Sequence, residues 1–465
     1  MNRRLLYGII FILFFQLSVV DSFSQLTYQG NNYLEWSIDR ENDKQYFEDW
    51  AEFFLGYKDF RAGLRFEAHE PPQPYSPDTT GYGIAQRFLE YRKSYFTATL
   101  GNYYTLFGRG LVLRSFENRM IRWDTNIDGG KVDFNHPLLD AEVIAGRPRD
   151  RSGRRQEWLE GGYLKFKPIS LLDIGGTFVT TDLKDKGRVY WGSVLADLNF
   201  DWGEFYFERA FKDFPSQYPK GKAYYLMGNI YYGNATILME YRDYDQFDIT
   251  EGLTYNNSPT VFREHLYTLL NRHQRVQDAR DEKGYQVEFT YGIGDNTVLT
   301  LNNNRTTNHN GLVLYREYYG QLEFDPSDYW SLVGGAGQQE NLEARYLNFV
   351  GTAKWIISDY HAIKAIVEHQ HAKILLNDRQ YYDQALTLTY DIFSRVTLSL
   401  ISERTTDQLS EEDYWIAGQV DVHLPKNFDL TVFGGNRRKG KICAGGVCIN
   451  RPAFEGIEIR LLNRF

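Results

Sequence analysis

The chain has 465 residues and a formal net charge of −9 at pH 7, a balance that disfavours nucleic acid as a partner. Aromatic residues make up 16% of the chain, yet its mean hydropathy is only −0.50. A soluble protein of this length usually divides into domains with aliphatic cores, whereas a transmembrane β-barrel combines many aromatic residues with strands that are polar at every second position. The composition therefore favours a barrel.

The N-terminus has the pattern of a secretory signal peptide. Two arginines precede an apolar run over residues 5–20, and small residues follow at 22–24. We therefore expect residues 1–24 to be removed and residues 25–465 to form the mature protein. No later apolar stretch reaches the roughly 20 residues that a membrane-spanning helix needs.

Short segments of the mature chain alternate between apolar and polar residues. Residues 235–241, 363–367, 396–400 and 457–461 each place apolar side chains at every second position. This is the period of a β-strand with one apolar face, which must contact either lipid or a protein core.

The connections alternate between tight turns and longer polar loops, as in outer-membrane barrels with periplasmic turns and extracellular loops. Turns are predicted at 58–59, 92–94, 135–137, 167–168, 201–202, 233–234, 295–296, 326–328, 358–359, 394–395 and 425–427, and long loops at 71–83, 147–156, 211–222 and 405–413. The pattern predicts an all-β fold: a single transmembrane antiparallel barrel of about 24 strands, with a range of roughly 22 to 26, and both termini in the periplasm. A β-propeller or a secreted sandwich would also have many short strands, but no repeat of blade length is visible.

The last strand ends in alternating apolar residues. Ile457, Ile459, Leu461 and Phe465 resemble the C-terminal signal that barrel-assembly machinery recognises, although Asn463 departs from that pattern. We therefore expect this machinery to be a partner of the chain.

Several stretches are similar to a known family. They are GLRFE (63–67), GNYYTLFGRGLVLRSFENR (101–119), IDGGKV (127–132), PTVFREHLYTLLNRH (259–273) and a C-x4-C hairpin before the last strand. Together they resemble a family of outer-membrane β-barrels from Bacteroidota that is known mainly as a domain of unknown function. The resemblance implies an outer-membrane location and one closed barrel, and it brings no substrate and no catalytic residues.

A barrel of this size encloses a lumen wide enough to need a plug. Strand-like sequence begins within a few residues of the predicted cleavage site, so we expect the chain's own loops or a partner protein to fill the lumen. One candidate is the long connection 245–283, in which a helix is predicted at about 259–280 with one apolar face. This helix could cover the barrel mouth or fold inward as a plug.

A second candidate is the stretch from Phe107 to Gly129, where opposed charges could set a pore constriction by concentrating the electric field. Alternatively, the same charges could form ordinary salt bridges that hold a long hairpin. The constriction candidates are Arg109, Arg114, Glu117, Arg119, Arg122, Asp124 and Asp128.

Two further groups lie in predicted extracellular loops. Guanidinium groups match phosphate geometry, so an arginine-rich loop could contact lipopolysaccharide, or it could simply be solvated. Its candidates are Arg147, Arg149, Arg151, Arg154 and Arg155. Cys443 and Cys448 flank a short turn and, in an oxidising compartment, are expected to form a disulfide.

No catalytic motif can be assembled from the sequence, so we expect neither an enzyme nor a bound cofactor or metal. Two functions remain from the sequence. The first is a porin-like channel for small polar solutes in the outer membrane. The second is a non-transporting scaffold, or a component of a surface-assembly or secretion complex, closed by a plug protein or by its own helix.

Overall fold

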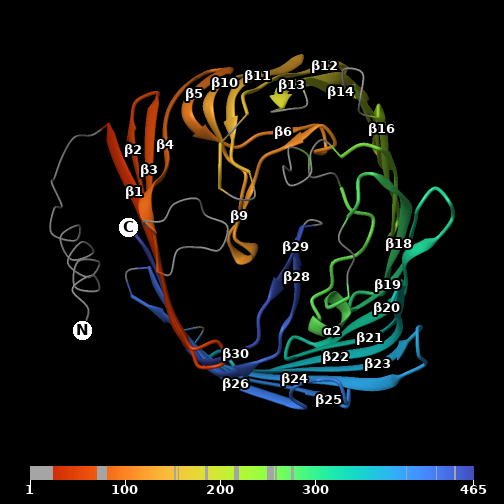
Figure 1. Cartoon of the computed structure of the whole chain (residues 1–465). Helices are drawn as coiled ribbons and strands as arrows, with labels where there is room; N and C mark the ends of the chain where they lie inside the picture. Colours follow the sequence, from red (N-terminus) through yellow and green to blue (C-terminus); the bar gives the residue numbers. More distant parts are fainter. Residues whose placement is uncertain are drawn as a thin grey trace.

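The computed structural model describes residues 25–70, 81–150, 153–155, 157–183, 187–213, 219–248, 256, 259–273, 277–393, 395–425, 427–444 and 447–465. The predicted signal peptide lies outside these residues and stays a prediction. The fold is all-β, and its main sheet has 24 strands, which agrees with the number expected from the sequence. Figure 1 shows these strands as a ring around a lumen.

The strands of the wall are 8 to 15 residues long, a range around the roughly 9–11 residues that cross a hydrocarbon layer at a tilt. They are β1 (Leu26–Asp39), β2 (Lys44–Tyr57), β3 (Phe60–Glu70), β4 (Tyr82–Lys93), β5 (Phe96–Tyr103), β10 (Ile127–His136), β11 (Leu139–Pro148), β12 (Leu159–Ile169), β13 (Leu172–Leu183), β14 (Gly187–Phe200), β15 (Gly203–Asp213), β16 (Gly221–Tyr232), β17 (Ala235–Asp245), β18 (Asp281–Ile293), β19 (Thr297–Thr307), β20 (Val313–Ser327), β21 (Trp330–Asn341), β22 (Ala344–Ser358), β23 (His361–Ile374), β24 (Gln380–Ile392), β25 (Val396–Thr405), β26 (Tyr414–Leu424), β27 (Phe428–Arg437) and β30 (Phe454–Arg464).

Each wall strand pairs antiparallel with its neighbours in the ring, and the first strand closes on the last. Asn31 of β1 lies opposite Arg464 of β30, and Asp39 lies opposite Gly456. Closure leaves no unpaired edge, which a sheet surrounded by lipid requires.

One end of the barrel carries the short turns, and we call it the turn end. The other carries the long connections, and we call it the loop end.

The outer face of the wall is apolar and uncovered. Leu100 is 65% exposed and Val143 is 64% exposed, and large apolar side chains on most other strands are similarly open. A soluble protein does not expose apolar surface on this scale. The outer face therefore has the apolar character of the lipid-facing surface of outer-membrane barrels.

The inner face carries polar side chains that other groups cover. Glu317, Gln339, Asn348 and Gln370 are all fully buried. They alternate along their strands with outward apolar residues such as Phe349 and Val367. Something inside the barrel must therefore cover this polar wall.

Three connections at the loop end fold inward and supply that cover, as Figure 1 shows for the labelled elements β6, β9, α2, β28 and β29. They join β5 to β10 (residues 104–126), β17 to β18 (residues 246–280, of which 246–248, 256, 259–273 and 277–280 are described) and β27 to β30 (residues 438–453, of which 438–444 and 447–453 are described). Their elements are β6 (Leu106–Phe107), β7 (Leu113–Arg114), β8 (Glu117–Asn118), the 3-10 helix η1 (Arg119–Ile121), β9 (Trp123–Asp124), the helix α2 (Thr268–Asn271), β28 (Gly440–Ala444) and β29 (Val447–Arg451). We refer to them as the 104–126, 246–280 and 438–453 segments.

The helix predicted at 259–280 is wrong in its extent, because α2 covers only Thr268–Asn271. The apolar face was predicted from Phe262, Leu266, Leu269, Leu270 and His273. These residues do not form one surface, because Leu266 is 98% exposed, whereas Phe262 packs near Tyr315 and Leu270 packs on Tyr319. Contacts with separate parts of the wall thus override the helical periodicity. In the described part of the chain, no helix is long and apolar enough to cross a membrane.

At the seam between β30 and β1, the residue that interrupts the C-terminal pattern lies beside other polar residues. Asn463 lies opposite Asn32, whose side-chain amide donates to Asp49. Phe465 exchanges backbone hydrogen bonds with Gly30, and a side chain at Gly30 would collide with the Phe465 ring. The terminal residue is therefore part of the closed wall.

Candidate functional site

The 104–126 segment packs an apolar stretch against the inner wall. Phe107, Leu111 and Leu113 are almost completely buried in one cluster with Trp191 and side chains from strands β10 to β17. The Trp191 indole also donates a hydrogen bond of 2.7 Å to the carbonyl of Val112. Burying such side chains stabilises the segment by about 1.5–3 kcal/mol each, so it is a fixed part of the lumen.

The other half of the same segment is held by charges. Arg65 of β3 donates to both carboxylate oxygens of Glu117 at 2.7 Å and to Glu52 of β2 at 2.7 Å. Arg119 donates to Glu52 at 2.6 Å, and Arg122 pairs with Glu48. The Arg65–Glu117 pair is bidentate, and such guanidinium–carboxylate pairs are strong and directional. They fix the segment to the wall strands β2 and β3.

The predicted constriction residues therefore separate into three groups. Glu117, Arg119, Arg122 and Asp124 lie in the lumen and form ion pairs, as in the alternative that the sequence left open. Arg109 and Arg114 lie over the rings of Tyr206 and Phe116. Burial lowers the pKa of Arg114, and Glu264 partly offsets that effect.

Asp128 does not reach the lumen. It follows Ile127, which is fully buried on the inner side of β10, so its side chain points to the outer face. There its carboxylate lies 3.7 Å from the exposed guanidinium of Arg87. The structure thus brings six of the seven predicted residues into the barrel and excludes this one.

The 246–280 segment is bound to the opposite part of the wall. The backbone N–H groups of Thr268 and Leu269 donate to Glu368 of β23 at 3.1 and 2.7 Å. His265 Nε2 lies 2.8 Å from Glu317 Oε1 of β20. The segment folds inward, which is the second of the two placements considered for it.

Wall amides complete the attachment of this segment. Gln339 of β21 donates to the carbonyl of Leu270 at 2.8 Å, and Gln370 of β23 donates to the carbonyl of Leu269 at 3.1 Å. Because buried backbone groups must find partners, these amides replace the hydrogen bonds that a longer helix would have made.

Two inward segments share one pair of wall carboxylates. Arg272 of the 246–280 segment donates to both oxygens of Glu403 at 2.7 Å and lies 3.5 Å from Asp383. Arg438 of the 438–453 segment donates to Glu403 at 2.9 Å and lies 3.0 Å from Asp383. We call these four residues the latch cluster.

The 438–453 segment also meets the third segment, because β28 contacts η1 inside the lumen. The three segments are therefore linked to one another across the barrel. Cys443 and Cys448 are direct register partners in the β28–β29 hairpin. Their disulfide stays a prediction.

The arginine-rich loop divides between two environments. Arg147 and Arg154 are exposed, whereas Arg149 donates to Asp124 at 3.2 Å and Arg155 donates to the carbonyl of Asn126 at 2.9 Å. Arg149 and Arg155 therefore hold the C-terminal end of the 104–126 segment. Arg151 lies outside the described residues.

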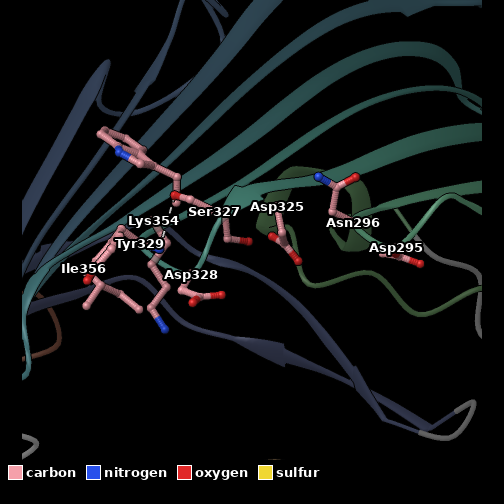
Figure 2. Close-up of a pocket in the computed structure, with 10 residues that line it drawn as sticks. Asp295, Asn296, Asp325, Ser327, Asp328, Tyr329, Lys354 and Ile356 are labelled. Atoms are coloured by element: carbon pink, nitrogen blue, oxygen red, sulfur yellow. Dashed lines mark hydrogen bonds between the residues drawn. The ribbon is translucent and has the colours of Figure 1, made fainter.

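A shallow pocket of about 420 Å³ lies at the turn end, between the β18–β19 and β20–β21 turns. Figure 2 shows Asp295, Asp325 and Asp328 along it, with Lys354 from β22 nearby. Among the described residues, no three His, Cys, Asp or Glu side chains are arranged to hold a metal ion.

Sequence reasoning missed the wall residues that receive the inward segments. They are Glu48, Glu52, Arg65, Glu317, Glu368, Asp383 and Glu403. Their signal was present, because each is a charged residue at the polar position of an alternating strand. Their partners could not be read from spacing, since those lie far away in the sequence.

Comparison with known proteins adds the family and the fold. Residues 16–312 match a family described as "Family of unknown function (DUF6029)". The chain belongs to this family. No curated protein matches the sequence.

Among solved structures, the chain resembles the translocation pore of the P pilus usher PapC, with a TM-score of 0.53, 11% identity and coverage of 94% of this chain and 99% of that one. It also resembles the E. coli P pilus tip assembly intermediate PapC-PapD-PapK-PapG, with a TM-score of 0.57, 12% identity and coverage of 96% and 61%. At these identities the likeness shows the fold, which is that of outer-membrane β-barrels.

Proposed function

We propose that this DUF6029 protein is a porin-like channel of the outer membrane that passes small polar solutes beside its inward segments. The turn end faces the periplasm and the loop end faces the exterior, as in other outer-membrane barrels. The apolar outer face supports the location, and the signal-peptide pattern is consistent with export.

One observation carries the proposal: charged side chains inside the barrel are reached by solvent. Arg122 and Arg460 point inward from the segment and from the wall, and their side chains are 38% and 37% exposed. These exposed fractions leave room for water beside the inward segments. Water around opposed charges is what a polar pathway needs.

The experiment is current measurement with the purified mature protein in planar bilayers. We expect discrete conductance steps, enlarged by replacing residues 259–273 with a short flexible linker. Absence of conductance steps in both the wild-type protein and the linker variant would contradict the proposal.

The second candidate is a non-transporting barrel that supports a surface-assembly or secretion complex. The linkage of all three inward segments favours it, because contacts that cross the lumen can also close it. Persistent silence together with co-purification of a stoichiometric partner protein would favour this function over a channel.

A further inference from the structure

One partly buried guanidinium inside the barrel has no ion-pair partner among the described residues. Arg451, at the end of β29, stands three residues before Phe454, the register partner of Arg437, and it interacts electrostatically with Arg437 of β27 and Arg460 of β30. Within the described residues, Arg451 makes neither a hydrogen bond nor an ion pair. A buried charge without a partner is costly.

The nearby carboxylates are already engaged. Glu458 is shared by Arg437 at 3.6 Å and Arg460 at 3.2 Å, and Glu35 accepts a hydrogen bond of 2.6 Å from Tyr33. Burial lowers the pKa of Arg451 to about 10, and the like charge of Arg437 adds to this effect. The surroundings therefore favour an additional negative charge.

The inward carboxylates of β2, the next strand beyond β1, are paired with other arginines. Glu48 pairs with Arg122, and Glu52 pairs with Arg65 and Arg119. Three guanidinium groups thus face two carboxylates, Glu458 and Glu35, which leaves a local positive excess of one charge.

The cluster is both ordered and accessible. The Arg437 guanidinium lies over the rings of Phe433 and Phe454, at 5.4 and 4.7 Å from their centroids, and its buried Nε has no hydrogen-bond partner among the described residues. Stacking fixes the plane of this guanidinium, while the exposed side chain of Arg460 opens the cluster to the lumen.

We propose that Arg437, Arg451 and Arg460 bind the oxyanion group of a small solute, a carboxylate or a phosphate, inside the lumen. Guanidinium groups match both groups with paired hydrogen bonds. The inference rests on the proposed channel for the solute's route through the membrane, but binding itself requires no current.

The test measures binding of acetate and of inorganic phosphate to the purified barrel by calorimetry, with chloride keeping the ionic strength constant. We expect Arg451→Gln to weaken binding roughly tenfold or more, since a charge-assisted hydrogen bond is lost. Glu458→Gln should tighten binding severalfold, because the competing carboxylate is removed. Arg345→Gln changes a paired arginine on the outer face and should leave binding unchanged.

The two central variants are expected to change affinity in opposite directions, which a general loss of structure cannot do. If Arg451→Gln fails to fold, the sign of the Glu458→Gln effect decides alone. Binding of only one anion would identify the chemistry of the solute. Absence of binding by both anions, or equal affinities of the wild type and Glu458→Gln, would overturn the site.

The outcome is separable from that of the channel. Conductance steps without anion binding would keep the channel and reject this site. Anion binding without conductance would keep the site and reject the channel.

Discussion

Arg272 and Arg438 belong to different inward segments, yet both place their guanidinium groups on the carboxylates of Glu403 and Asp383. Neither segment can leave the wall without exposing its half of this latch cluster. The two segments are therefore coupled, although no strand joins them directly.

The first prediction concerns this coupling. Glu403→Gln leaves two buried guanidinium groups facing each other with only Asp383 between them, and breaking a buried pair costs about 3–5 kcal/mol. We expect larger or more frequent conductance steps and faster proteolysis within 438–453. The matched control is Glu340→Gln, because Glu340 also pairs with two arginines, Arg316 and Arg345, but on the outer face. Equal behaviour of the two variants would count against the latch.

The second prediction concerns pH. Burial, together with the positive charge of Arg272, lowers the pKa of His273 to about 3, where the ring stacks on Tyr346 and bonds Gln370. A His released from this site regains a pKa near 6.5, so the released state binds more protons between about pH 3 and 6.5. The seated segment is therefore fully stable above about pH 6.5 and loses stability as the pH falls.

At pH 5 the loss relative to pH 7 is about 2 kcal/mol, because the released histidine is then mostly protonated. We expect conductance to increase between pH 7 and pH 5 and the His273→Gln variant to lose most of that dependence. Other acid effects on the bilayer are controlled by His371→Gln, which changes a histidine stacked on Tyr382 on the outer face. A pH profile that survives in His273→Gln would refute the assignment.

The strand number and the turns could be predicted from sequence because each depends on neighbouring residues. Alternation, turn residues and loop lengths are local, and the described turns lie at or next to the predicted positions, except that 167–168 falls inside β12 and the turn follows Ile169. The inward folding of 246–280 depends instead on Glu317, Glu368 and Glu403, which are distant in sequence. The helix was predicted wrongly because its periodicity gives no information about these distant contacts. The placement of Asp128 failed differently: its charge suggested the lumen, but its position directly after buried Ile127 turns it outward.

A third prediction tests the apolar attachment of the 104–126 segment. Phe107→Ala removes a fully buried ring from the cluster around Trp191, and such a change costs about 3–5 kcal/mol. We expect the wall to stay folded, with unchanged heat-modifiable migration, while open-channel noise increases. Leu106→Ala is the control, because the Leu106 side chain, next to Phe107 in the sequence, is 50% exposed. If the open-channel noise of both variants equals that of the wild type, the segment is not held by this cluster.

A fourth prediction concerns the cysteine hairpin. Since Cys443 and Cys448 are register partners, oxidation closes a short loop that stabilises the hairpin by about 2 kcal/mol. Alkylation of the denatured, unreduced protein should label neither residue, and mass spectrometry after reduction should find both labelled. Two free thiols in protein exported to an oxidising compartment would disprove the disulfide.

The last prediction addresses the membrane itself. Val367 points outward from the middle of β23, and an arginine there costs about 2–4 kcal/mol in hydrocarbon, whereas the cost near an interface is about 0–1 kcal/mol. Val367→Arg should therefore insert poorly into liposomes, while Tyr232→Arg, at the turn end of β16, should insert nearly as well as the wild type. Both variants add one charge to an exposed site, so only burial in lipid distinguishes them. Equal insertion yields would mean that this face of the wall does not contact hydrocarbon.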